Sequence, residues 1–165
     1  MPFQTRAFAV AAAAVFLAGM QVALADAPSI KVKLWEKSGK EGMTLSQDKM
    51  EEGSVEFVVT NTSTDPILGN MHEFLVFPWK GSIDSLPYDA KLRTVDEDKL
   101  PPFEGLEDML PSATETVRLV LKPGTYVLLS NQLPGDYKAG MVREFTVLSH
   151  AQWDRLNQSG NTRSH

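Results

Sequence analysis

The sequence contains no cysteine among its 165 residues. That absence excludes disulfide bonds, cysteine nucleophiles and every metal site that depends on a thiolate ligand. A domain built from this chain must therefore be stabilised by its hydrophobic core, and roughly 120 residues can bury enough apolar surface to do so.

Positive charge is scarce as well. Sixteen Lys and Arg residues stand against 21 Asp and Glu residues, giving a formal net charge of −5. Because nucleic-acid binding needs a basic surface, we expect no nucleic-acid partner. The sequence also lacks a Gly-x-Ser-x-Gly elbow, a glycine-rich phosphate loop and a His-Glu-x-x-His motif. These absences predict that the protein is not an enzyme.

Long apolar runs are missing except at the N-terminus. An alanine-rich run over residues 7–22 precedes Ala23-Leu24-Ala25, which has the small-x-small pattern of a cleavage site. The pattern predicts a signal peptide over residues 1–25, cut before Asp26, and is less typical of a membrane anchor. No other stretch is long and apolar enough to cross a bilayer. We therefore expect an exported, periplasmic protein with no membrane anchor after cleavage, and a possible protein partner in the periplasm.

The remaining chain is rich in short strand patterns. Apolar and polar residues alternate in several segments, and turn residues separate them at close spacing. The predicted strands are Ser29 to Trp35, Met43 to Leu45, Ser54 to Asn61, His72 to Phe77, Thr114 to Leu121 and the two arms of a hairpin within Gly124 to Val147. Such a series predicts an all-β, Greek-key β-sandwich over residues 26–149.

Two segments depart from this pattern. Residues 80–111 contain several prolines and many charges, which predicts a long irregular excursion with one or two helical turns, one of them near Val95 to Leu100. Residues 150–165 form a polar C-terminal tail. Within it we expect a helical turn at Ala151 to Asn157 and no ordered structure in the last eight residues.

Three stretches of the chain carry a more specific signal. They are GSVEFVVTN followed by MHEFLV, then LKPGTYVLLSN, and finally LPGDYKAGM followed by EFTV. Together they resemble the cupredoxins, a family of small copper-binding β-sandwiches that includes plastocyanin and azurin. The resemblance spans about Ile30 to Leu148 and implies a cupredoxin-like fold with a copper site at one tip.

The resemblance also implies a ligand set of His, Cys, His and Met. His72 stands at the position of the first His, and Met141 stands at that of the Met. Ser130 occupies the Cys position and Asp136 the second His position, in a loop one residue longer than usual. A serine hydroxyl cannot replace the thiolate of a blue copper centre. The resemblance therefore predicts a degenerate type 1 site without blue-copper electron transfer.

Copper remains the expected cofactor, at a non-standard site made of His72, Met141 and Asp136. Cu(I) accepts imidazole and thioether ligands, so His72 and Met141 could hold it with one more donor, for which Met43 is a candidate. Cu(II) would prefer His72 with Asp136 and water. The predicted role is copper handling. The alternatives are a metal-free module for protein interaction and an accessory subunit of an exported system.

Each candidate residue also has a purely structural interpretation. His72 heads a buried strand, where a histidine is often only hydrogen-bonded, and Met141 could fill the core. Asp136 suits a turn, and Glu73 is expected on the solvated face opposite His72. Ser130, His72 and Asp136 could form a hydrolytic triad, but no sequence signature of an oxyanion hole supports it.

Overall fold

The computed structural model describes residues 27–37, 40–63 and 70–161. The predicted signal peptide at residues 1–25 lies outside the described residues.

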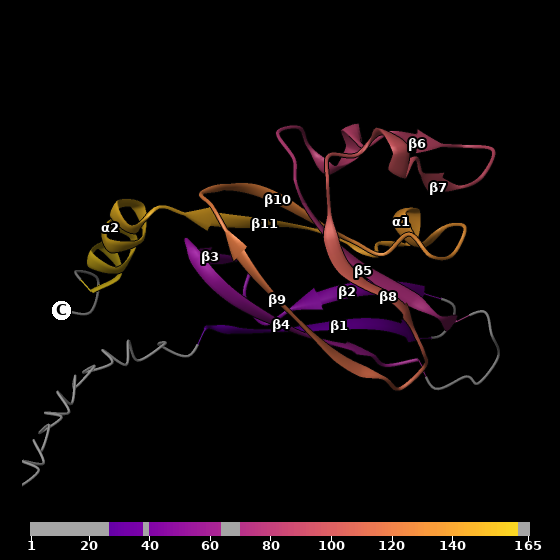
Figure 1. The fold of residues 1–165 in the computed structure, drawn as a ribbon, viewed down its shortest axis with the longest axis horizontal. Helices are drawn as coiled ribbons and strands as arrows, with labels where there is room; N and C mark the ends of the chain where they lie inside the picture. Colours follow the sequence, from indigo (N-terminus) through magenta and orange to yellow (C-terminus); the bar gives the residue numbers. More distant parts are fainter. Residues whose placement is uncertain (1–26, 38–39, 64–69, 162–165) are drawn as a thin grey trace, which may run out of the picture.

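The described chain folds into two packed β-sheets (Figure 1). The first sheet has the order β2-β1-β4-β9, with β1 at Ser29–Lys37, β2 at Lys40–Leu45, β4 at Gly53–Asn61 and β9 at Thr114–Leu121. The second has the order β3-β11-β10-β5-β8, with β3 at Lys49–Glu51, β5 at His72–Pro78, β8 at Glu104–Met109, β10 at Gly124–Leu129 and β11 at Val142–Leu148. The predicted all-β sandwich is therefore confirmed.

Strand pairing is mixed in both sheets. β1 runs parallel to β4, and β3 runs parallel to β11, while the other pairs within the two sheets are antiparallel. Strands that are distant in sequence thus become neighbours, as Greek-key connections require.

The core lies between the two sheets. Phe57 of β4 packs against Phe74 of β5 and Phe145 of β11, with ring centroids 5.4 and 5.6 Å apart. All three rings are fully buried, so each contributes a large apolar area to the sandwich. Because the chain has no disulfide, this contact across the layers is central to its stability.

β5 is buried on both faces, which explains why its sequence is almost continuously apolar. Phe74 and Val76 lie in the main core, whereas Leu75 and Phe77 lie in a second apolar cluster. The second cluster also contains Leu86 and Val95 of the excursion, together with Val127, Leu129, Tyr137 and Val142. The excursion therefore covers the outer face of the second sheet.

The excursion is more regular than the sequence predicts. It contains the 3-10 turns η2 (Ile83–Ser85) and η3 (Glu97–Lys99) and a small ribbon of β6 (Tyr88–Asp89) and β7 (Thr94–Val95), at the upper right of Figure 1. The helical turn expected near Val95 to Leu100 is confirmed by η3. The sequence pattern missed β8, which returns the excursion to the edge of the second sheet.

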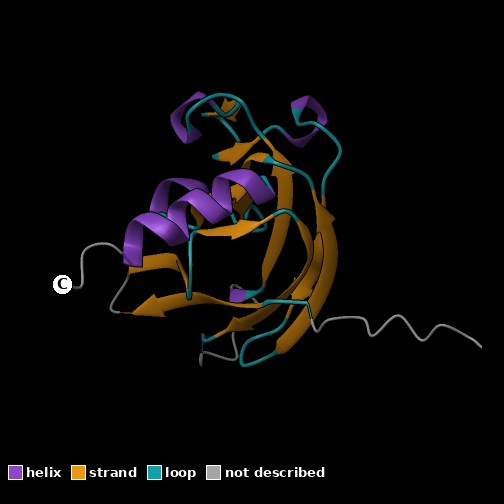
Figure 2. Ribbon diagram, turned by 90° about the vertical axis from the view of Figure 1, so that its left-hand side faces the viewer, coloured by secondary structure: helices purple, strands orange, loops and turns teal. Residues whose placement is uncertain are grey.

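The C-terminal tail also differs from expectation. Helix α2 runs over His150–Asn161, so it is longer than the single turn predicted. The expected lack of structure in the last eight residues is wrong for residues 158–161, which continue the helix, and residues 162–165 are outside the described part. α2 packs near β3 and β11 and crosses the front of the molecule in Figure 2. None of the described helices is long and apolar enough to cross a membrane.

Candidate metal centre at the sandwich tip

The tip that carries the predicted site is the connection between β10 and β11. Helix α1, Asp136–Ala139, is a single turn flanked by Gly135 and Gly140, whose φ angles are 114° and 106°. Glycine tolerates this left-handed conformation without the steric cost that a Cβ brings. Backbone bonds from Ser130 N to Met141 O (2.8 Å) and from Met141 N to Asp136 O (3.0 Å) close the neck of the loop.

The structure brings His72 and Asp136, two of the three predicted ligands, together with Ser130. Asp136 Oδ2 lies 3.2 Å from His72 Nδ1 and accepts a 2.8 Å hydrogen bond from Ser130 Oγ. The backbone N–H of Leu133 donates to the same oxygen at 3.3 Å. His72 and Asp136 are each 1% exposed. Asp136 is thus a buried hydrogen-bond acceptor rather than only a turn residue.

The order of these contacts does not match a hydrolytic triad. In such a triad an imidazole contacts the serine hydroxyl and removes its proton. Here the carboxylate stands between the two, and the Ser130 hydroxyl donates to Asp136 instead of to His72. The geometry therefore does not place the imidazole as a general base for Ser130.

Two atoms of this cluster lack hydrogen-bond partners. Across the described chain, the buried side-chain polar atoms without a partner are Ser63 Oγ, His72 Nε2 and Asp136 Oδ1. Most buried polar groups in folded proteins are paired, because an unpaired one loses its solvation. A buried ring nitrogen with a free position is chemically suited to a metal ion.

Three fully buried methionines belong to the core that reaches the tip. Met43, Met109 and Met141 are all 0% exposed and lie in the main apolar cluster. Met141 follows α1 directly, and Met43 N donates to Gly140 O at 3.3 Å. Met109 stands opposite His72 in the β5–β8 pairing. Sequence reasoning missed Met109 because it lies in the segment assigned to the irregular excursion.

Glu73 was predicted on a solvated face, and this prediction is wrong. Glu73 is only 7% exposed because the excursion covers that face of β5, and its Oε1 accepts a 2.9 Å hydrogen bond from Asn131 N. Asn131 Nδ2 donates to Glu97 Oε1 at 2.7 Å. Burial, and then the nearby charge of Glu97, raise the pKa of Glu73 to about 7. No local sequence signal could have shown this environment.

Asn131 also connects the tip to the excursion. Its Oδ1 accepts a 2.7 Å bond from Val95 N, and its Nδ2 donates to Val95 O at 2.9 Å. The partners of the Asn131 side chain therefore lie in the excursion. Gly135 N adds a 2.8 Å bond to Arg93 O.

A small pocket of about 350 Å³ lies on the solvent side of the tip. Trp35, Glu41, Arg93 and Pro134 are among the residues that line it. Burial raises the pKa of the Glu41 carboxyl, and the charge of Asp136 raises it further. The Glu41 carboxyl therefore lies close enough to Asp136 for the two groups to interact electrostatically.

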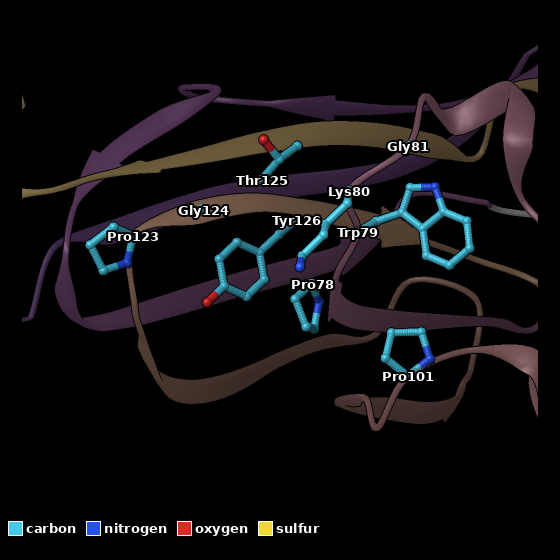
Figure 3. A pocket seen from close by; sticks show the side chains of 9 residues that line it. All are labelled: Pro78, Trp79, Lys80, Gly81, Pro101, Pro123, Gly124, Thr125 and Tyr126. Atoms are coloured by element: carbon cyan, nitrogen blue, oxygen red, sulfur yellow. The ribbon is translucent and has the colours of Figure 1, made fainter.

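A larger open groove, of about 750 Å³, lies at the opposite end of β5 from His72 (Figure 3). Figure 3 shows Pro78 between the rings of Tyr126 and Trp79. The polar atoms of both rings are already bonded, Trp79 Nε1 to Ser85 Oγ at 3.2 Å and Tyr126 OH to Lys122 O at 3.0 Å. The described residues that line the groove offer ring faces but include no histidine or carboxylate.

Among the described residues, no group of three or more His, Cys, Asp or Glu side chains is arranged to hold a metal ion. A metal at the tip would therefore need ligands outside that set. The thioethers of the buried methionines are the available donors.

The two sheets, their order and the tip define a cupredoxin-like fold. The solved structure of rusticyanin from Thiobacillus ferrooxidans matches with a TM-score of 0.50 and 16% identity, covering 73% of this chain and 76% of that one. A structure of substituted rusticyanin matches over the same shares with a TM-score of 0.50 and 18% identity. A multi-copper oxidase from Pediococcus acidilactici matches with a TM-score of 0.48 and 13% identity, over 77% of this chain and 27% of that one. No protein-family model and no curated protein sequence matches this chain.

Proposed function

We propose that this protein is an exported, periplasmic cupredoxin-like protein that binds copper at a non-standard site for copper handling, without blue-copper electron transfer and without catalysis. The observation that carries the proposal is the tip cluster. A buried imidazole contacts a buried carboxylate, keeps one nitrogen free, and lies in a part of the core rich in methionine. The N-terminal run and cleavage pattern of residues 1–25 support export.

The donor set fits copper in its reduced form. Imidazole and thioether ligands suit soft Cu(I), whereas Ca²⁺ and Mg²⁺ require several oxygen ligands. His72 and Met141 would hold the ion, and Asp136 supplies a negative charge in contact with His72. A bound ion would give the free nitrogen of His72 a partner.

The residues at the tip also argue against blue-copper electron transfer. A blue copper site needs a thiolate, and the hydroxyl at residue 130 is committed to Asp136. The buried tip excludes water and holds the imidazole in one orientation, which favours retention of a bound ion.

The direct test is an anaerobic Cu(I) titration against a competing chelator. The wild-type protein should bind one equivalent. His72→Ala should abolish this binding, and Met141→Leu should weaken it by at least tenfold. Met50→Leu is the matched control, because Met50 is 2% exposed and lies in β3, which pairs with the end of β11 that is distant from the tip. If His72→Ala and Met141→Leu both still bind one equivalent of Cu(I) with the wild-type affinity, the proposal is contradicted.

One observation favours a second candidate, a metal-free module for protein interaction or an accessory subunit. Asp136 Oδ2 already accepts hydrogen bonds at its position between β5 and β10, so the tip is closed without an ion. For such a module, elemental analysis of the protein purified from the periplasm should find no copper. One equivalent of copper would favour the first proposal.

A further inference from the structure

Resting on the proposed function, we infer that Cu(I) binds at His72 Nε2 with Met109 as a thioether ligand, while Asp136 Oδ2 positions the imidazole. This assignment differs from the ligand set that the sequence predicts. It specifies the coordinating nitrogen of His72, adds a residue from the excursion and gives Asp136 Oδ2 a positioning role.

The first step concerns the two ring nitrogens. His72 Nδ1 is 3.2 Å from a carboxylate oxygen that also accepts from Ser130 and Leu133. A carboxylate can only accept, so Nδ1 carries the proton. In neutral imidazole the lone pair then belongs to Nε2, which is buried and has no partner. Histidine ligands commonly donate the other N–H to a carboxylate in this way.

The second step concerns the direction in which the imidazole lies. His72, Phe74 and Val76 share one face of β5 because side chains alternate along a strand. Phe74 and Val76 belong to the core between the sheets, as do Met43, Met109 and Met141. The imidazole therefore lies at the end of the core where the thioethers are.

The third step places Met109 beside His72. The two residues are direct partners in the antiparallel β5–β8 pairing, where Cβ atoms of opposed residues are about 4.5–5.5 Å apart. Asn61 Nδ2 donates a 3.0 Å hydrogen bond to Met109 O and fixes the backbone there. Met109 itself is 0% exposed.

A β-bulge is responsible for this placement. Phe74 pairs with Leu106, whereas His72 pairs with Met109, so β8 has one extra residue in this interval. Asp108 takes a left-handed φ of 52° within it. Regular alternation would have turned Asp108 inward and Met109 outward. The bulge reverses this and puts a thioether, not a carboxylate, opposite the imidazole.

Charge favours the monovalent ion. An ion buried among methionines loses its hydration, and a compensating charge must be nearby. Asp136 provides one negative charge in contact with His72, which is enough to balance the single charge of Cu(I). Thioethers also prefer the softer ion.

The test uses the full protein purified after export, with ¹⁵N-labelled histidine and ¹³C-methyl methionine. Anaerobic addition of Cu(I), or of Ag(I) as a substitute that air does not oxidise, should shift the Nε2 resonance of His72 and the methyl resonance of Met109. The Nδ1 resonance should retain the signature of a protonated nitrogen. Met109→Leu should lower the Cu(I) affinity by at least tenfold, and Met50→Leu should leave it unchanged.

A second variant separates the positioning role of Asp136 from ligation. Asp136→Asn keeps an oxygen that accepts from Nδ1, so the ion should remain on Nε2 with an affinity lowered by about 10–100-fold. If Nδ1 coordinates the ion and Met109→Leu has no effect, this inference is wrong while the proposed copper function stands. If neither ion binds, both are wrong.

Discussion

Asp136 Oδ2 is the atom on which the polar groups of the tip converge. It accepts hydrogen bonds from Ser130 Oγ and Leu133 N and lies 3.2 Å from His72 Nδ1. Ser130 and His72 are both at most 1% exposed. Removing this acceptor would leave buried donors without partners, which costs more than the hydrogen bonds themselves are worth.

We therefore expect Asp136→Ala to lower the free energy of unfolding by about 2–4 kcal/mol. Urea denaturation followed by tryptophan fluorescence measures the change. Asp154→Ala, on the exposed surface of α2, is the control and should change stability by less than about 0.5 kcal/mol. Equal effects of the two substitutions would show that the cluster contributes nothing to stability.

Glu73 gives the molecule a pH-dependent stability. Its folded-state pKa of about 7 is above the usual carboxyl pKa of 4.5 because burial disfavours the charged form. The folded state thus holds the proton more tightly than the unfolded state. This contribution to stability is complete below pH 4.5 and is lost as the pH rises to about 7.

Glu73→Gln keeps an oxygen that can accept from Asn131 and removes the ionisable group. At pH 8 the variant should be more stable than wild type by roughly 1–2 kcal/mol, once solvent screening is allowed for. At pH 4 the two should be nearly equal. Thermal melts across this pH range measure the difference, and a stability gap that does not vary with pH would contradict the prediction.

At the scale of elements, β8 is the strand that makes the excursion part of the sheet. Its attachment to β5 depends on the absence of a side chain at Gly105. A Cβ there would lie 1.9 Å from Phe74 O, a backbone atom that cannot move aside without breaking the pairing. The same strand places Met109 opposite His72.

Gly105→Ala should therefore detach β8 from β5. We expect a loss of roughly 2 kcal/mol or more, together with faster amide exchange in residues 104–109 and weaker Cu(I) binding. Gly53→Ala is a useful comparison, because Gly53 has no atom within 4 Å of the added Cβ and its cost is confined to its positive φ of 131°. Amide exchange in β8 that stays at the wild-type rate would contradict the steric argument.

At the scale of the whole molecule, an acidic chain without disulfides encloses a small polar cluster at one end of an apolar sandwich. Anything that binds only the folded state stabilises it by mass action. Copper at a hundredfold excess over its Kd should add about 2.7 kcal/mol, which corresponds to a rise in Tm of roughly 5–10 °C. Differential scanning calorimetry under anaerobic conditions measures it. The Tm of His72→Ala should not rise when copper is added. If the Tm of the wild-type protein does not rise either, the metal-free module is favoured.

The pattern of alternating apolar residues was enough to predict the sandwich, since that alternation follows from strand geometry and needs no knowledge of neighbouring strands. The sequence by itself also determined that any copper site lacks a thiolate, and it selected His72, Ser130 and Asp136, which the structure brings together. The tertiary structure alone decided that the carboxylate lies between hydroxyl and imidazole, that Glu73 is covered, and that Met109 stands opposite His72. The reason is physical: these features depend on a bulged register and on a distant segment folding over one face, and no local pattern encodes either.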